Sequence, residues 1–344
     1  WKTSSLNGSY AKSFENKLAF QNSKRVILSS KNLTEEYIVI DKMVNIDGVD
    51  LKIEIAYKLS KNKEGRDVIV SEQDSKLFVF FSTEKVTFLN FIIQGPFRTT
   101  STRENVPFND DKNKVLLEEV GGLISESLFV VKELGFFDIN FLNVLPILSA
   151  HSDDVIYSLA YQKVKQALST EKLWPTKDGN YSEVGESLLA RGRDLTDLLD
   201  QNDTIKLFSR KNWLDINITN DKTKDLRDYL VNTLDVPEID FEKFVKKITR
   251  EFLESKSDDW MINFYKHLYN RRDEMSLWNL LKRTPIIRLD TNEHISPLDS
   301  RGLSQVYFGS GLKSSYKTIK SVFVENENSR KFLEALGIKK PGIF

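Results

Sequence analysis

The segment 77–133 constrains the fold of this chain most, because it joins two short apolar runs, a polar loop and a long amphipathic pattern. The runs at 77–81 and 88–93 are rich in aromatic and β-branched residues, which is typical of buried strands. The second run ends at Gln94-Gly95-Pro96, where glycine and proline interrupt strand pairing. The segment therefore predicts two strands, a loop and a helix, in that order.

The loop at 97–111 carries two arginines, Arg98 and Arg103, beside a run of four hydroxyl residues at 99–102. Three residues near its end can cap the next helix, since their side chains accept from the free N–H groups of the first turn. These residues are Asn109, Asp110 and Asp111. A loop of this composition between a strand and a helix is suited to holding cations against an anion.

Apolar residues recur at three- and four-residue spacing from 112 to about 134, which predicts a helix packed on a sheet. Gly121-Gly122 inside this pattern predicts either close packing against a strand or a helix break. Further strands are expected at 25–30, 36–40, 49–59 and 68–70, with Asp47-Gly48 as a turn between two of them. The expected sheet is mostly antiparallel and the fold class is α+β.

The pattern changes near residue 149, and helical periodicity predominates from 153 onward. Helices are expected at 154–168, 182–199, 223–234, 241–255, 258–269 and 273–281, with Ser257 or Asp258 among the candidate caps. We therefore expect four parts. They are a polar segment at 1–23 forming a loop or poorly ordered start, an α+β domain at 24–148, a helical domain with short β segments at 149–281, and a second, weakly repeat-like α+β segment at 282–344.

Two phrases recur weakly in the second half of the chain. The run 173–181 resembles 284–296, since both have an extended proline-bearing stretch, a turn and a strand-like return. The run 226–237 resembles 330–341, where a charged helix ends in an apolar phrase. A true duplication would make this region an irregular array that presents a surface, and both duplication and chance similarity stay open.

Composition excludes several classes of site. The chain has 344 residues, 50 basic and 50 acidic side chains and no cysteine, so disulfides and thiol chemistry are excluded and a DNA-wrapping or membrane-coating surface is disfavoured. No apolar run approaches the roughly 20 residues that span a bilayer. The chain begins with Trp1 rather than Met, and we expect a segment of a longer cytoplasmic protein.

The run LFVFFSTEKVTFLNFIIQGPFRTTSTREN at 77–105 resembles the middle-region signature of bacterial sacsin-type ATP-binding proteins. Those proteins begin with a GHKL ATPase domain like that of heat-shock protein 90, and their signature ends roughly in QGPFRTTPxRxN. This chain has Ser82 and Ser101 where proline is usual. The runs 173–199, 213–240 and 282–295 also resemble segments that follow the signature, so the resemblance covers most of the chain from about Leu51 onward.

The resemblance implies a transducer-like middle domain that completes an ATPase site. ATP and Mg would be bound by an upstream GHKL domain of the same protein, because this chain lacks its nucleotide-binding motifs. Arg103 is implied as the cation that senses the γ-phosphate, with Arg98 second. Supporting groups of the loop would be Gln94, Thr99, Thr100 and Asn105.

The implied protein is a full-length ATPase, of which this part alone is inactive. It would act in a chaperone-like or antiphage-defence role, with a protein client and a homodimeric full-length form as further expectations. From the residues alone, Arg98 and Arg103 could instead pair with Glu104, Asp110 or Asp111 and simply hold the loop.

Two alternatives from other classes stay open. One is a non-enzymatic scaffold for protein interaction. The other is a nucleic-acid-binding module of a defence system, for which Arg271-Arg272, with basic and aromatic neighbours, would be the candidate surface. Helix-core spacing of the aromatic residues favours a packed helix pair at that place. The sequence has no P-loop, GxSxG or HExxH motif.

Overall fold

The apolar and β-branched runs before residue 95 form one sheet in the computed structural model, which describes residues 11–17, 22–29, 34–102, 104–309 and 317–340. The strand order is β1-β2-β3-β4-β8-β6-β7, and β5 pairs with β4. Only the β6–β8 pairing is parallel among these described strands. The predicted α+β class with a mostly antiparallel sheet is thus confirmed. The strands are β1 (Ala11–Lys17), β2 (Ser23–Ser29), β3 (Thr34–Ile46), β4 (Val49–Lys61), β5 (Asp67–Val70), β6 (Lys76–Val79), β7 (Phe81–Val86) and β8 (Ile92–Gln94).

The hairpin of β3 and β4 is the centre of this sheet. Its turn is Asp47-Gly48, and both residues have positive φ angles, 52° and 77°, as a two-residue turn that matches the strand twist requires. The predicted turn is therefore confirmed.

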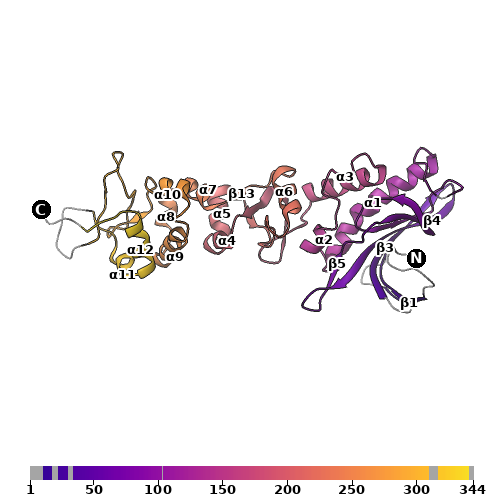
Figure 1. Cartoon of the computed structure of the whole chain (residues 1–344), viewed down its shortest axis with the longest axis horizontal. Helices are drawn as coiled ribbons and strands as arrows, with labels where there is room; N and C mark the ends of the chain where they lie inside the picture. The colour runs from indigo at the N-terminus through magenta and orange to yellow at the C-terminus, as the bar shows by residue number, and fades with distance from the viewer. Residues whose placement is uncertain (1–10, 18–21, 30–33, 103, 310–316, 341–344) are drawn as a thin grey trace. The chain divides into compact units, whose positions relative to one another are not determined.

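Helix α1 (Asp111–Glu133) lies on one face of the sheet, and α3 (Val155–Thr170) packs on α1 (Figure 1). The buried hydroxyl groups of Tyr57 on β4 and Ser127 on α1 are 2.8 Å apart. Lys42 on β3 reaches two glutamates of α1, Glu119 at 3.2 Å and Glu126 at 3.0 Å. Apolar packing and these polar contacts together fix α1 on the sheet.

Gly121 explains how closely α1 and α3 approach. A Cβ atom at this position would lie 3.1 Å from a methyl carbon of Leu159 and 3.1 Å from a side-chain carbon of Lys163, both on α3. The helix continues unbroken through Gly121-Gly122. The close neighbour is thus a helix, and the expectation of a strand or a break was wrong.

Three strand expectations need correction. Ala11–Lys17 forms β1, where a loop was expected, and the rest of that polar segment lies largely outside the described residues. Strand β7 was not predicted. The run 88–93 supplies only the short β8, because Phe88 has a left-handed φ of 57° and interrupts the extended chain.

The chain forms two units, the first comprising Trp1–Gly185 with Asn217–Val236 and the second Glu186–Ile216 with Pro237–Phe344. Helix α3 belongs to the first unit, so that unit extends beyond the boundary predicted at 148/149; independent folding on either side of that boundary stays a prediction. The other elements of the first unit are α2 (Ile139–Leu142), α6 (Lys224–Asn232), η1 (Val184–Glu186) at its edge, and the hairpin of β9 (Trp174–Pro175) with β10 (Tyr181–Ser182).

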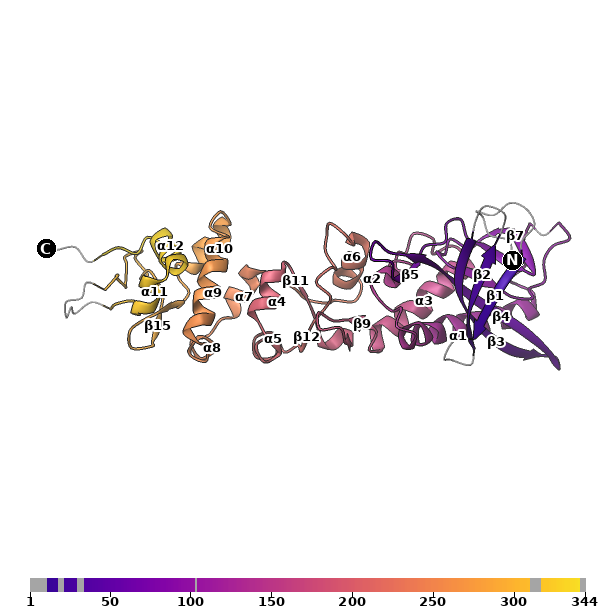
Figure 2. The ribbon, with the colours of Figure 1, turned by 90° about the horizontal axis from the view of Figure 1, so that it is seen from below.

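The second unit is mainly helical and has a core of aromatic side chains, including Phe244, Phe264, Tyr265 and Phe332. Helix α12 lies against α9 (Figure 2). Its helices are α4 (Arg193–Leu198), α5 (Gln201–Phe208), α7 (Phe241–Lys247), α8 (Arg250–Glu254), α9 (Asp258–Tyr269), α10 (Met275–Leu281), α11 (Ser321–Glu325) and α12 (Glu327–Ala335). Its strands are β11 (Ser187–Ala190), β12 (Asn212–Trp213), β13 (Glu238–Ile239), β14 (Ile287–Arg288) and β15 (His294–Ile295).

Two helix predictions in the second unit were wrong in part. The run 182–199 was expected to be one helix, but Ser187–Ala190 pairs in parallel with β12 and β13, which buries Leu188 and Leu189 on a small sheet. The run 241–255 divides into α7 and α8, because the Thr249 side chain accepts from the Phe252 N–H and caps a new helix. Among the described residues, no helix is long and apolar enough to cross a membrane.

Candidate functional site

The loop predicted to face a phosphate begins at a fixed point on the sheet. Gln94 ends β8, and the N–H of Gly95 donates to the carbonyl of Phe78 at 3.0 Å. A Cβ atom on residue 95 would lie 2.9 Å from the ring of Phe97, which is buried. Glycine is required here because the chain folds back on itself to insert that ring.

Asn113, in the first turn of α1, fastens both ends of the loop. Its side-chain oxygen accepts from the Arg98 N–H at 2.8 Å, and its side-chain nitrogen donates to the carbonyls of Arg98 at 2.9 Å and Pro107 at 3.0 Å. The side chain is fully buried. Sequence reasoning missed this residue, although its spacing from Leu116 and Val120 places it on the buried face of the helix.

Arg98 pairs with the helix cap. Its Nη1 donates to Oδ2 of Asp110 at 2.9 Å, while the other oxygen of Asp110 accepts from the Asn113 N–H and caps α1. The Arg98 hydrogen bond, with help from that backbone N–H, holds the pKa of Asp110 below its ordinary value. Of the three predicted cap candidates, Asp110 is therefore the one that caps the helix. Arg98 pairs with this nearby carboxylate, as the alternative of local pairing predicted for it.

The tip of the loop closes between Thr100 and Asn105. The Thr100 N–H donates to the Asn105 carbonyl at 3.0 Å, and the Asn105 N–H donates to the Thr100 hydroxyl at 3.2 Å. Within this closed turn the Thr102 hydroxyl donates to the Glu104 carboxylate at 3.1 Å, and both side chains are exposed. Arg103 lies outside the described residues, so the structure places only its two neighbours.

The other predicted supporting residues differ in their surroundings. Thr99 is half-buried beside Arg98, and the side-chain oxygen of Asn105 accepts from the next N–H, that of Val106, at 2.9 Å. Thr100 and Asn105 therefore shape the turn itself.

Gln94 belongs to a polar cluster at the foot of the loop. Its side-chain nitrogen donates to the buried carboxylate of Glu54 at 2.8 Å, and that carboxylate also meets the ammonium groups of Lys52 at 2.7 Å and Lys24 at 3.4 Å. The side-chain oxygen of Gln94 is buried and has no hydrogen-bond partner among the described residues. An unmatched buried acceptor costs about 1–3 kcal/mol, so a donor approaching this atom would bind favourably.

The basic and aromatic segment of the second unit comprises α9, α10 and the turn between them. Arg271 donates to Asp194 at 2.7 Å, and its guanidinium carbon lies 3.8 Å from the centre of the Phe241 ring. Tyr265 is fully buried in the core. Arg271 is therefore committed to contacts within the unit.

Among the residues that the structure describes, no group of three or more His, Asp or Glu side chains is placed to hold a metal ion. Comparison of the chain with protein-family models, with curated proteins and with solved structures found no match.

Proposed function

We propose that this chain is the middle and following region of a sacsin-like GHKL-type ATP-binding protein, and that the loop after β8 completes an ATPase site. ATP and Mg would be held by an upstream domain of the same protein. The observation that supports this best is the construction of the loop, whose two ends are fastened by Asn113 while its tip, closed at Thr100 and Asn105, stays exposed.

This construction suits a group that must reach another domain. Phosphoryl transfer spreads negative charge over the terminal oxygens, and a positioned guanidinium stabilises that charge with two parallel hydrogen bonds. Fastened ends keep the tip in a limited set of positions, which lowers the entropy lost when it meets the phosphate.

The two arginines then have different roles. Asp110 holds Arg98 at the base of the loop, so Arg98 is a positioning residue. Arg103 lies in the sequence between the exposed residues Thr102 and Glu104, and in this proposal it is the catalytic cation. Gln94, whose side-chain oxygen has no hydrogen-bond partner in the described part of the chain, would orient a donor at the foot of the loop.

The test uses the full-length protein. Arg103→Ala should lower ATP turnover by about 10³-fold, as is common for a catalytic arginine, while ATP affinity changes little. Arg103→Lys should recover only part of the rate, because a point charge does not reproduce the planar fork. Arg98→Ala is the matched control and should reduce turnover less.

Equal turnover in Arg103→Ala and the unmodified protein would refute the proposal and leave the loop a structural element. A larger loss in Arg98→Ala than in Arg103→Ala would exchange the two roles. Calorimetry on this chain alone should detect no tight ATP binding, and tight binding with turnover would contradict the assignment of the nucleotide site to an upstream domain.

A further inference from the structure

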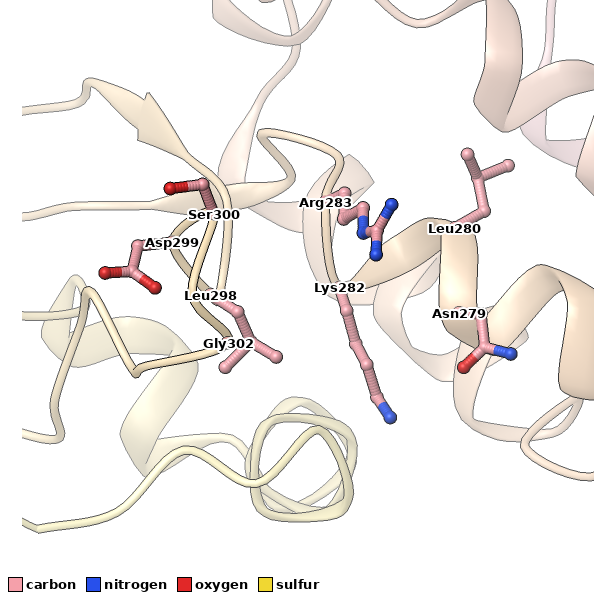
Figure 3. A pocket seen from close by; sticks show the side chains of 8 residues that line it. All are labelled: Asn279, Leu280, Lys282, Arg283, Leu298, Asp299, Ser300 and Gly302. Carbon is pink, nitrogen blue, oxygen red and sulfur yellow. The ribbon is translucent and has the colours of Figure 1, made fainter.

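An open cavity of about 590 Å³ lies in the second unit between the end of α10 and the turn at 298–302 (Figure 3). Lys282 and Arg283 follow directly after the last residue of α10. The cavity is lined by Asn279, Leu280, Lys282, Arg283, Leu298, Asp299, Ser300 and Gly302.

The two walls of this cavity are tied to each other. The Leu298 N–H donates to the Lys282 carbonyl at 3.3 Å, and the Ser296 hydroxyl donates to the Arg283 carbonyl at 2.9 Å. The turn is also fixed internally, since Oδ1 of Asp299 accepts from the N–H groups of Arg301 and Leu303, both at 2.8 Å. The cavity is therefore a preformed groove, which lowers the cost of binding.

The charge of the groove is unbalanced. Neither the ammonium of Lys282 nor the guanidinium of Arg283 has a hydrogen-bond or ion-pair partner among the described residues, and both side chains lie between the turn and the helix (Figure 3). Asp299, the one acidic residue of the lining, is engaged by the turn, and the Leu303 N–H is the main cause of its lowered pKa. The groove is thus lined by two cations without a partner among the described residues and by one carboxylate that is already hydrogen-bonded.

The remaining lining residues distinguish between kinds of anionic ligand. Leu280 and Leu298 provide aliphatic surface, while Asn279 and Ser300 provide neutral hydrogen-bonding groups. No lining residue is aromatic, and single-stranded nucleic acid is generally bound on aromatic stacking surfaces. A ligand that carries carboxylates on both sides of an aliphatic side chain is complementary to this lining, because its carboxylates can pair with the two cations while its aliphatic side chain contacts the two leucines.

We propose that this groove binds a short acidic peptide segment of a partner protein, with an aliphatic side chain flanked by Asp or Glu. A carboxylate of the peptide pairs with the Arg283 guanidinium and a second with Lys282, while the aliphatic side chain contacts Leu280 and Leu298. The inference is independent of the proposed ATPase role, because it depends on other residues in the other unit.

The test is fluorescence anisotropy with the whole chain and a labelled nonapeptide that has leucine at its centre and alternating Asp and Glu on both sides. Saturable binding is expected, and raising the salt concentration should weaken it because the groove is open to solvent. A matched peptide with Asn and Gln in place of the acids should bind at least about tenfold more weakly, the loss expected for about 1.4 kcal/mol.

Lys282→Gln combined with Arg283→Gln should weaken binding of the acidic peptide by at least about tenfold. Lys247→Gln removes one exposed lysine of α7 outside the groove and should leave binding unchanged. Equal binding by the double variant and the unmodified chain would overturn the proposal, as would equal binding of the neutral peptide.

A labelled single-stranded oligonucleotide of similar charge is the third probe. Weak oligonucleotide binding that is insensitive to the double substitution is expected. Oligonucleotide binding that exceeds peptide binding and depends on Lys282 and Arg283 would assign the groove to nucleic acid instead.

Discussion

Two hairpins, β9–β10 in the first unit and β14–β15 in the second, share one backbone design. In the first, the Thr176 N–H donates to the Asn180 carbonyl at 2.9 Å and the Gly179 N–H to the Thr176 carbonyl at 3.1 Å. In the second, the Leu289 N–H donates to the Glu293 carbonyl and the Asn292 N–H donates to the Leu289 carbonyl, both at 2.9 Å. Positive φ angles fall at matching positions, 76° at Gly179 and 65° at Asn292.

The two hairpins differ in the side chains that they pair across the strands. The first pairs Pro175 with Tyr181, whose ring packs edge-on against Phe137 and whose hydroxyl donates to the Phe137 carbonyl at 2.8 Å. The second pairs Arg288 with His294 at the equivalent position.

Arg288 is buried and fully engaged. Its guanidinium donates to His294 Nε2 at 3.1 Å, to Asp258 at 2.7 Å, and to the carbonyls of Leu253 and Lys256 at 2.7 Å each. The same turn thus accommodates an apolar pair or an ionic network. The turn residues therefore determine the backbone conformation of the hairpin, while the cross-strand pair determines how sensitive its stability is to substitution and pH.

The largest expected effect is on the ionic hairpin. Arg288→Met should lower the free energy of unfolding of the second unit by about 3–5 kcal/mol, because it removes three charge-assisted hydrogen bonds. Asp258 keeps its ion pair with Lys320 at 2.7 Å and the Leu253 carbonyl keeps the Lys256 N–H, whereas the Lys256 carbonyl is left without a donor among the described residues. Urea unfolding, with hydrogen exchange to assign the change to each hairpin, measures it. Pro175→Ala is the matched change in the other hairpin and should cost about 1–2 kcal/mol. Equal losses would show that the two cross-strand pairs are energetically alike.

The second effect is a pH dependence confined to the ionic hairpin. Burial, together with the nearby Arg288 charge, lowers the pKa of His294 from 6.5 to about 4. The unfolded chain takes up this proton near pH 6.5 and the folded chain only near pH 4, so the stabilisation is complete above pH 6.5 and declines between these values. The decline should reach about 3 kcal/mol for this buried group.

Melting temperature between pH 4 and pH 7 checks this expectation. His294→Gln retains an acceptor for Arg288 and cannot take up a proton, so its stability should decline less steeply on acidification than that of the unmodified chain. His151→Gln changes an exposed histidine and should follow the unmodified chain. Identical pH profiles for His294→Gln and the unmodified chain would contradict the assignment.

A smaller effect is expected in the apolar hairpin. Tyr181→Phe keeps the ring against Phe137 but removes the hydroxyl that donates to its carbonyl, which should lower the unfolding free energy of the first unit by about 1 kcal/mol. Tyr265→Phe is the counterpart in the second unit, where the buried hydroxyl donates to the Ile286 carbonyl at 2.7 Å, and its loss should be greater. The reverse order, measured by urea unfolding, would contradict the link between burial and cost.

The smallest effect is expected from exchanging the turn residues. Gly179→Asn and Asn292→Gly should each change stability by less than about 1 kcal/mol, because glycine and asparagine both adopt left-handed φ angles readily. Gly179→Val is the contrasting variant and should cost about 1–2 kcal/mol, since a β-branched residue is strained in this region. A thermal melt that ranks Gly179→Asn with Gly179→Val would mean that the turn tolerates only glycine.

The recurrence of the hairpin supports the first of the two sequence similarities. The second has a smaller structural counterpart, because α6 and α12 are both followed by a residue with positive φ, 54° at Asp235 and 89° at Gly337. Duplication of the whole region and chance similarity both stay open, since the elements between these landmarks differ.

Local patterns predicted the parts of the fold that local forces determine. The alternation along β4, the turn at Asp47-Gly48, the three- and four-residue spacing along α1 and a helix cap within 109–111 could all be read from the sequence, and the structure identifies the cap as Asp110. The strand at Ser187–Ala190 could not be predicted, because its two adjacent leucines fit a buried helix and a buried strand equally well. Only the pairing with β12 and β13 distinguishes the two structures.

The same distinction applies to the site. The residue composition of 97–111 predicted the arginine loop and a helix cap at its end. Pairing of Arg98 with a nearby carboxylate was one of two alternatives that the sequence left open. The hydrogen bonds of Asn113 join residues that lie 6 and 15 positions apart, and no periodicity encodes such contacts. Arg103 keeps its predicted role as a proposal.

The attachment of Asn113 has a mechanical consequence. One end of the loop continues a strand bonded to β4 and β6, whereas the side chain that clasps Arg98 and Pro107 is carried by α1. A displacement of the helix along the sheet would therefore move the loop with it, because the two are joined by hydrogen bonds of 2.8–3.0 Å. Because Gly95 is hydrogen-bonded to Phe78 on the sheet, such a displacement would act on the short segment between Gly95 and Arg98.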